Sequence, residues 1–276
     1  MLIRKIRFLG FTLLFVCSPY LQKLVAQAIS LDQVSPTTAW SLPMAISPGS
    51  GGFNSQPVSW YDRPIIKDLA VPAVLIGDGL ATYDHHEFLF SSADLKGEIV
   101  EDYPHFHTSW DNYLQYAPAA ETFALRLAHM QPAHDFRHQL VLFATTTLIQ
   151  GVVVTSLKYA VHEQRPDGSD FHSFPSGHTT TAFGGAMFLY EEYKASPHAW
   201  LAYSGFPVAA ATAALRLYNN KHWYSDVAVG AALGMLCTEA SYALLPHVDR
   251  WLRRKHPTPA AESNVPWLFL SRSALQ

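Results

Sequence analysis

From about residue 67 onward, the chain consists of apolar stretches separated by short segments that contain Pro, Gly or charged residues. Neither the alternation of apolar and polar residues that is typical of strands nor an internal repeat stands out. The pattern predicts an all-α fold, a helical bundle of about six core helices. The predicted helices lie near residues 68–80, 111–130, 138–160, 178–194, 199–216 and 223–245.

Two of these helices contain apolar stretches whose lengths are borderline for crossing a membrane. Residues 140–157 form an 18-residue stretch without a charge, and residues 227–245 carry only Glu239. A membrane-spanning helix needs about 20 predominantly apolar residues. Buried helices of a large bundle would show the same pattern, so both interpretations stay open.

Residues 1–28 are typical of an export signal. Three basic residues among the first seven precede an apolar stretch at 8–17, and Ala26-Gln27-Ala28 offers a cleavage site between small residues. An uncleaved anchor helix is the alternative interpretation. Both interpretations place the remainder of the chain outside the cytoplasm.

The rest of the chain divides into three parts. Residues 29–66 are a lead-in rich in Ser, Pro and Gly, without a hydrophobic period. Residues 67–247 contain all the predicted helices and form the main domain. Residues 248–276 are a basic and polar tail.

Composition excludes several classes of protein. Apolar residues make up 49% of the chain, and charged residues make up only 15%, against about 25% in an average protein. These values exclude a disordered chain, a collagen-like repeat and a small disulfide-stapled domain. The net charge of −3, with no basic stripe interleaved with aromatic residues, argues against a nucleic-acid partner.

The first segment with candidate chemistry runs from Lys158 to Arg165 and Pro166. Lys158 and Arg165 are seven residues apart, so on a helix they share a face, roughly 10 Å apart along the axis. Pro166 disfavours helical geometry at Arg165. The helix should therefore end here and direct two cations beyond its end.

The second segment is Pro175-Ser176-Gly177-His178, at the start of a predicted helix. Ser176 is a natural N-cap, and Gly177 allows the backbone to come close to a ligand. The free amides of the first helical turn can bind an anion, and His178 beside them could donate a proton.

The third segment contains Arg216, His222 and Asp226. His222 and Asp226 are four residues apart, so on a helix they share a face. The carboxylate can accept the imidazole N–H, which fixes the tautomer and leaves the other ring nitrogen free to attack an electrophile.

In an up-and-down bundle, all three segments fall at the same end. That end would gather three cations, a set of helix amides and two histidines, without a matching cluster of acids. A tetrahedral dianion fits this set, because Arg forks, a Lys point charge and backbone donors all suit its oxygens.

The motifs Lys-x6-Arg-Pro, Pro-Ser-Gly-His and Arg-x5-His-x3-Asp, in this order, resemble the type 2 phosphatidic acid phosphatase (PAP2) superfamily. This superfamily also contains bacterial class A acid phosphatases and vanadium haloperoxidases. By this resemblance, His222 is the nucleophile, Asp226 orients it and His178 protonates the leaving oxygen. The residues that the resemblance implies as ligands of the phosphoryl oxygens are Lys158, Arg165, Ser176, Gly177 and Arg216.

The resemblance implies a phosphatase that acts on a phosphomonoester or diphosphate through a phosphohistidine, without a metal or other cofactor, and that vanadate inhibits. The expected partner is a phosphorylated lipid or a small phosphate ester, with a lipid-linked substrate favoured. The expected location is the cell envelope, in the periplasm or in the inner membrane with the site facing the periplasm. The alternatives are a soluble, nonspecific periplasmic acid phosphatase, a haloperoxidase that keeps vanadate as cofactor, and a silent lipid-phosphate-binding protein.

Weaker signals lie outside the three motifs. We expect the helix start with Asp111, Asn112, Tyr113 and Tyr116 to lie near the site. His162, one turn after Lys158, fits packing better than substrate contact. A metal site is not predicted from the remaining acidic and histidine tracts, because their spacing completes no ligand set. These tracts contain Asp84, His85, His86, Glu87, His105 and His107.

Overall fold

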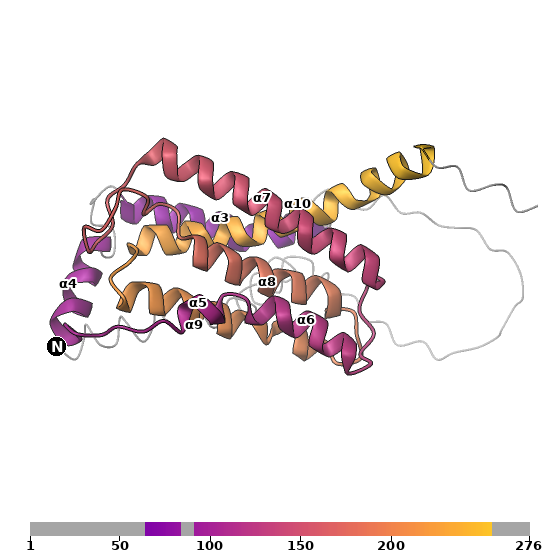
Figure 1. The fold of residues 1–276 in the computed structure, drawn as a ribbon, viewed down its shortest axis with the longest axis horizontal. Coiled ribbons are helices and arrows are strands. Elements are labelled where there is room, and N and C mark those ends of the chain that lie inside the picture. Colours follow the sequence, from indigo (N-terminus) through magenta and orange to yellow (C-terminus); the bar gives the residue numbers. More distant parts are fainter. Residues whose placement is uncertain (1–63, 84–90, 256–276) are drawn as a thin grey trace, which may run out of the picture.

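The computed structural model describes residues 64–83 and 91–255, and within these ranges every regular element is a helix (Figure 1). The all-α prediction is therefore confirmed for the described residues. The predicted export signal and most of the lead-in lie outside these ranges. The elements are α3 (Pro64–Tyr83), α4 (Ser92–Asp102), α5 (Asp111–Leu114), α6 (Ala117–Leu127), α7 (Phe136–Val161), α8 (Gly177–Tyr193), the 3-10 helix η3 (Ala199–Tyr203), α9 (Gly205–Tyr218) and α10 (Tyr224–Lys255).

Two predicted helices are each divided in two in the structure. The segment 111–130 forms α5 and α6, because Pro118 in the first turn of α6 favours a new helix start there. The segment 199–216 forms η3 followed by α9. In addition, α10 continues to Lys255, beyond the predicted end at residue 245.

Sequence reasoning missed α4. This helix begins with a capping box, in which Ser91 accepts from the amide of Asp94 and the Asp94 carboxylate accepts from the amide of Ser91. The spacing of Ser91 and Asp94 was a signal that could have revealed the helix start. Few apolar residues follow it, so a search for long apolar stretches passes over α4.

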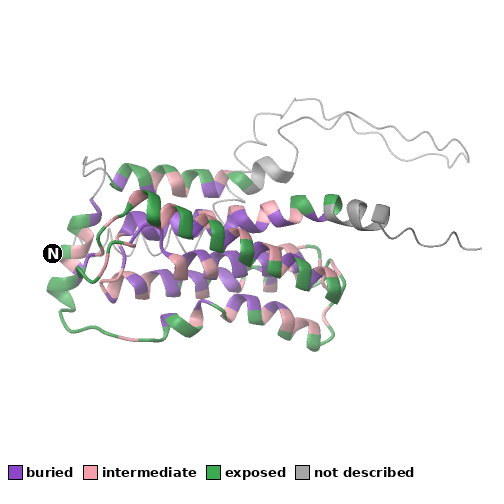
Figure 2. Ribbon diagram, turned by 45° about the horizontal axis from the view of Figure 1, so that its top comes forward, coloured by how far each residue is buried: buried purple, intermediate pink, exposed green. Residues whose placement is uncertain are grey.

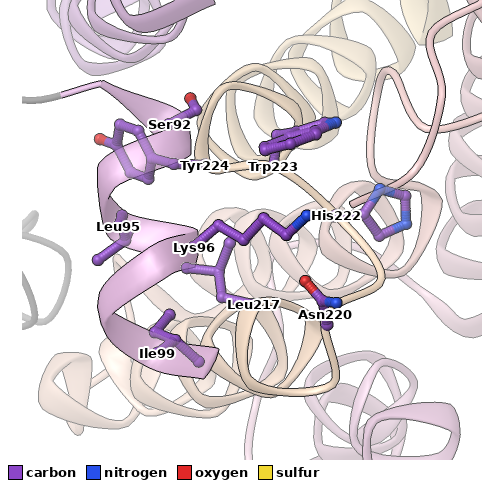
Figure 3. Close-up of a pocket in the computed structure, with 9 residues that line it drawn as sticks. All are labelled: Ser92, Leu95, Lys96, Ile99, Leu217, Asn220, His222, Trp223 and Tyr224. Atoms are coloured by element: carbon purple, nitrogen blue, oxygen red, sulfur yellow. The ribbon is translucent and has the colours of Figure 1, made fainter. Parts of the chain in front are cut away.

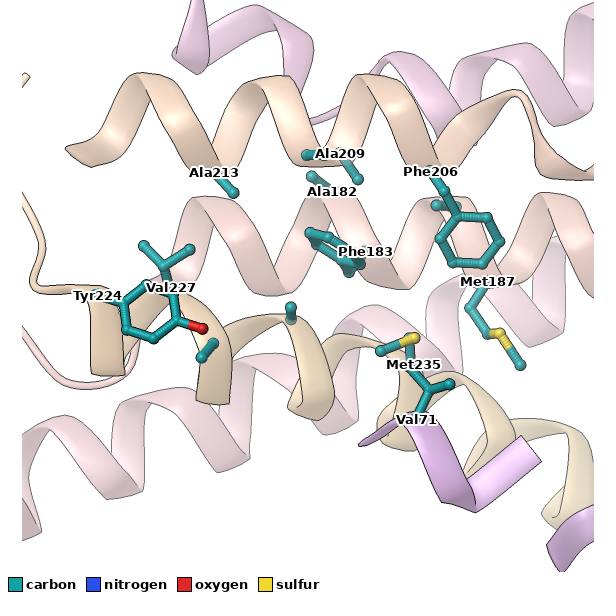
Figure 4. Packing of buried hydrophobic residues seen from close by; sticks show 14 residues of the cluster. Val71, Ala182, Phe183, Met187, Phe206, Ala209, Ala213, Tyr224, Val227 and Met235 are labelled. Atoms are coloured by element: carbon teal, nitrogen blue, oxygen red, sulfur yellow. The ribbon is translucent and has the colours of Figure 1, made fainter. Parts of the chain in front are cut away.

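The central element is α8, which packs against α6, α7, α9 and α10. Figure 2 shows that buried residues concentrate where helices face one another. Side chains from α3, α8, α9 and α10 fill the core between them (Figure 4). They include Val71, Phe183, Met187, Phe206 and Met235.

Helix α7 buries several polar residues among apolar ones and exposes many of its apolar residues. Gln139, Thr146 and Gln150 are buried on the inner face, and Thr146 bonds to Ser241 of α10 at 2.6 Å between hydroxyl oxygens. On the outer face, Leu148 and Val152 are 68% and 59% exposed. The exposed face is therefore more apolar than that of a typical surface helix in water.

Two helices of the described chain are long and apolar enough to cross a membrane, α7 and the Tyr224–His247 part of α10. In the most apolar stretch of α7, 17% of the residues are buried, against 61% in that of α10. The apolar composition of α10 is therefore mostly explained by the core, whereas that of α7 is not.

The tightest contact between α8 and α10 depends on Gly184 and Gly234. A Cβ atom at Gly234 would lie 2.8 Å from the backbone nitrogen of Gly184 and closer still to the carbonyl oxygen of Thr180. Both neighbours are backbone atoms, so they cannot move aside as a flexible side chain could. The small residues thus determine how closely the two central helices approach.

We expect Gly234→Ala to destabilise the protein by about 1–3 kcal/mol through overpacking. The melting temperature should then fall by roughly 3–10 °C. Gly77→Ala on α3 is the matched control, because nothing lies within 4 Å of a Cβ there. Thermal unfolding of both variants measures the difference, and equal melting temperatures would contradict the close-packing argument.

Candidate active site

The three motifs meet at one end of the bundle, at the left of Figure 1, which we call the site end. The last turn of α7, the first turn of α8, the end of α9 and the start of α10 all lie there. Lys158, His178, Arg216 and His222 come from these four places. The predicted convergence is therefore present in the structure.

His222 lies just before α10 and is held by Asp226 in the first turn of that helix. The Nδ1 atom of His222 lies 3.2 Å from Oδ2 of Asp226, and both residues are buried. On the other side of the ring, Nε2 lies 3.2 Å from Nη1 of Arg165. Because a guanidinium can only donate, Nε2 must be the accepting nitrogen and Nδ1 must carry the proton. This is the tautomer that an attacking imidazole needs.

The charge state of His222 agrees with this tautomer. Complete burial lowers its pKa to about 4, although Asp226 acts in the opposite direction. The nearby Arg216 and Arg165 lower the pKa further. The ring is therefore neutral at physiological pH, with a free lone pair on Nε2.

Arg165 is fixed by the segment that follows it. Its Nε atom lies 2.9 and 2.8 Å from the two carboxylate oxygens of Asp170, and its Nη1 donates to the carbonyl of Lys221 at 3.1 Å. Asp170 therefore anchors the guanidinium from behind, while Nη1 faces His222. The role of Asp170, which lies between the first and second segments, was not predicted.

Lys158, in the last turn of α7, binds backbone carbonyls of the connection between α7 and α8. Its Nζ atom donates to the carbonyl of His172 at 2.5 Å and lies 3.4 Å from that of Ser173. It also interacts electrostatically with Arg165, Arg216 and Asp226. The three predicted cations therefore belong to one electrostatic cluster.

The start of α8 is tied directly to α10. Ser176 is the N-cap residue, and its backbone N–H donates to the carbonyl of Asp226 at 3.0 Å. Its hydroxyl pairs with that of Thr179 at 2.9 Å and forms no cap hydrogen bond to the backbone. Gly177 follows as the first residue of the helix. The first amides of α8 therefore face the site end without a capping side chain.

His178 is half-buried, and its Nε2 atom lies 2.8 Å from the side-chain oxygen of Asn112 on α5. Burial lowers its pKa to about 4, and Arg216, Arg165 and Lys158 act in the same direction. Asp111 partly opposes this effect. In the free protein, His178 is therefore neutral.

Arg216 forms a buried ion pair with Asp111 of α5. One further atom on each side, Nε of Arg216 and Oδ1 of Asp111, is buried without a hydrogen-bond partner. The expectation that the start of α5 lies near the site is confirmed for Asp111 and Asn112. Tyr113 and Tyr116 are instead 71% and 58% exposed.

The surroundings of His222 include α4, which was not predicted. A small pocket beside the imidazole is lined by residues of α4, α9 and α10, including Ile99, Leu217 and Trp223 (Figure 3). Lys96 of α4 donates to the carbonyl of Pro166 at 2.6 Å, and its Nζ lies 5.1 Å from the centre of the Trp223 ring. The helix thus braces the segment that carries Arg165.

The structure also shows the surroundings of His162 and of Ser173. The ring of His162 stacks on Phe171 at 5.1 Å, and His162 adopts a left-handed conformation that ends α7. Among the described residues, no group of three or more His, Cys, Asp or Glu residues could hold a metal ion. Ser173 was missed altogether, although its hydroxyl donates to Oδ2 of Asp226 at 2.5 Å.

The site end combines a buried His–Asp pair, three cations and a second histidine within an all-helical bundle, a set of groups that suits a tetrahedral anion. Residues 139–249 match the model of the PAP2 superfamily, so this segment of the chain is a PAP2 superfamily segment.

Two known proteins are similar to the chain. A lipid A 1-phosphatase of Porphyromonas gingivalis is 38% identical over 138 residues, which cover 50% of this chain and 31% of that protein. The chain thus matches about a third of the length of this relative. The crystal structure of Aquifex aeolicus LpxE aligns with a TM-score of 0.41 at 21% identity, over 53% of this chain and 93% of the other.

We expect a bound tetrahedral dianion to raise the pKa of His178 toward its ordinary value of 6.5, because the anion offsets the three cations that now lower it. Because the protonated ring then binds the anion better, affinity should fall as the pH rises through this range. NMR titration of the histidine rings, with sulfate and with chloride at matched ionic strength, measures the change. An equal pKa in the two salts would contradict the assignment of His178 to the anion site.

Proposed function

We propose that the protein is a metal-independent phosphatase that removes a phosphate group from a lipid through a phosphohistidine at His222. The single observation that carries this proposal is the setting of the His222 ring. Its Nδ1 is bound to a buried carboxylate, and its Nε2 faces a guanidinium across 3.2 Å. A cation beside the nucleophile binds the phosphoryl group and so places the phosphorus atom close to the attacking nitrogen.

In the proposed mechanism, Nε2 of His222 attacks phosphorus in line with the leaving oxygen. Arg165, Lys158 and Arg216 stabilise the charge on the equatorial oxygens, together with the free amides of the first turn of α8, beginning at Gly177. The amide of Ser176, a predicted ligand, is instead bound to the carbonyl of Asp226. Metal ions perform this role in many other phosphotransferases. Water then cleaves the phosphohistidine.

His178 acts as the general acid. It is neutral in the free protein, but the substrate dianion raises its pKa, so the proton arrives with the substrate. Asn112 holds the ring at Nε2 until the leaving oxygen replaces it. The same histidine can then accept a proton from the water that attacks the phosphohistidine.

Two observations support a lipid-linked substrate. The outer face of α7 is largely apolar and exposed, and the last turn of this helix carries Lys158, within the site. The relative with 38% identity is named a lipid A 1-phosphatase. We therefore propose that α7 contacts the membrane and that the substrate is a phosphate on a membrane lipid of the lipid A type.

The proposed location is the cell envelope, with the site end facing the periplasm. The export signal predicted in residues 1–28 supports this orientation. The basic residues at 250–255 follow at the opposite end of α10 from His222, as the positive-inside rule would require of a spanning helix.

We expect phosphate release from lipid A and other phosphorylated lipids to exceed release from water-soluble phosphate esters. The measurement compares detergent-extracted membranes with a detergent-free soluble fraction on both substrate classes. A higher rate on water-soluble esters, with the activity in the soluble fraction, would favour a nonspecific acid phosphatase. Halide oxidation after vanadate loading would favour a haloperoxidase.

We expect His222→Ala to lower kcat by roughly 10³-fold or more, because the nucleophile is lost. His198→Ala is the matched control, since His198 is exposed at the start of η3 and lies outside the site. Quenching the wild-type reaction with radiolabelled substrate should trap an acid-labile, alkali-stable phosphoprotein. Activity of His222→Ala close to that of the control would contradict the mechanism.

We expect the activity to survive EDTA, because cationic side chains and helix amides perform the role that a metal would have. Vanadate should inhibit, since it can occupy the same cage in a trigonal bipyramidal form. Steady-state rates with EDTA, and with EDTA followed by added Mg²⁺ or Zn²⁺, provide the measurement. Loss with EDTA and recovery with a metal would contradict a metal-free reaction.

A further inference from the structure

Only one of the two carboxylate oxygens of Asp226 has hydrogen-bond donors. Its Oδ2 atom has three donors, namely the His222 ring at 3.2 Å, the Ser173 hydroxyl at 2.5 Å and the Trp223 amide at 2.9 Å. Its Oδ1 atom is buried and has no partner. A buried oxygen of an ionised carboxylate without a donor is costly and calls for an explanation.

The Glu163 carboxyl lies within hydrogen-bonding reach of Asp226. The backbone explains this position. Because His162 takes a left-handed conformation with φ of 53°, α7 ends there and Glu163 turns toward the connection to α8. The carbonyl of Glu163 then accepts from the amide of Ser173 at 3.0 Å, and the same Ser173 donates its hydroxyl to Asp226.

Oε2 of Glu163 is also buried and without a partner. Two ionised carboxylates at hydrogen-bonding distance repel each other, and both would leave an oxygen unsatisfied. One proton shared between them removes the repulsion and supplies the missing hydrogen bond. Asp226 already accepts three hydrogen bonds, which favour its charged form, so the proton resides on Glu163.

We propose that Glu163 is a positioning residue of the active site: it is protonated at neutral pH and donates a hydrogen bond to Oδ1 of Asp226. This bond fixes the carboxylate so that Oδ2 faces His222, and it adds no second negative charge. The inference rests on the proposed function for its effect on catalysis, but not for the protonation itself.

The neutral state of Glu163 matters for the nucleophile. A second anion beside Asp226 would favour protonation of His222 and so block the lone pair on Nε2. Burial, followed by the charge of Asp226, raises the pKa of Glu163 to about 9, which supports the neutral form. The other charged or titratable groups in this cluster are Lys158 on α7, Arg165 and Asp170 on the connection, Arg216 on α9 and His222 before α10.

The substitutions Glu163→Gln and Glu163→Ala test the positioning role. The Gln side chain keeps a donor for Oδ1 without a titratable proton, so kcat should stay within about twofold of wild type. The Ala side chain removes the donor, and kcat should fall roughly tenfold, a typical effect of one lost hydrogen bond. KM should change little in either variant, since the phosphate ligands are untouched. Glu101→Gln, at an exposed position on α4, is the matched control.

Infrared difference spectra test the protonation without any assay of activity. Wild type at neutral pH should show the carbonyl band of a protonated carboxyl group. Glu163→Gln should lack this band, Glu101→Gln should keep it, and in wild type it should disappear as the pH rises through about 9.

The outcomes separate the two proposals. An infrared band without phosphatase activity in wild type would reject the proposed function and keep the shared proton. Activity without the band would reject the shared proton. Glu163→Gln as impaired as Glu163→Ala, or both as active as wild type, would overturn the positioning role. Melting temperatures of the variants show whether a loss of activity reflects unfolding, and the wild-type spectrum decides the protonation even if Glu163→Ala does not fold.

Discussion

The site depends on one buried carboxylate, that of Asp226. Its side chain holds the His222 ring, the Ser173 hydroxyl and the Trp223 amide, while its backbone carbonyl accepts from the amide of Ser176. A single residue in the first turn of α10 therefore orients the imidazole and also determines where α8 begins. Because burying a charge without donors is expensive, the three segments must close together for the carboxylate to be tolerated.

The cations at the site end are held in place before any ligand arrives. Asp170 binds Arg165 and Asp111 binds Arg216, while Lys158 is directed by carbonyl groups. A preorganised cage avoids the reorganisation that mobile side chains would require in the transition state. Burial lowers the pKa of both histidines, and the nearby arginines act in the same direction, so both rings are neutral without a ligand. In the proposed mechanism, this state leaves His222 able to attack and gives His178 its proton only when an anion binds.

Whether a feature could be predicted from the sequence depends on how far apart its residues lie along the chain. Helical class, the convergence of the motifs and the His222–Asp226 pair follow from short-range patterns along the chain, although His222 lies just before α10 rather than on it. The pairing of Arg216 with Asp111 and the bracing by Lys96 join residues far apart in sequence, and no periodicity encodes them. In α7, apolar residues occur on the buried face as well as on the exposed face, so sequence alone could not tell a buried helix from one facing lipid.

The apolar outer face of α7 links the proposed substrate to the geometry of the site. The helix presents Leu148 and Val152 outward along its length and places Lys158 in its last turn. If the outer face lies in lipid, the site end sits where the apolar face stops, at the level of the head groups. A lipid could then bring its phosphate to His222 while its acyl chains stay beside α7. The acyl chains would then not have to leave the membrane for water, which costs about 0.8 kcal/mol for each CH₂ group. The depth of the site end in the membrane would thus favour substrates whose phosphate lies near the membrane surface. No pocket that encloses the whole lipid would be needed.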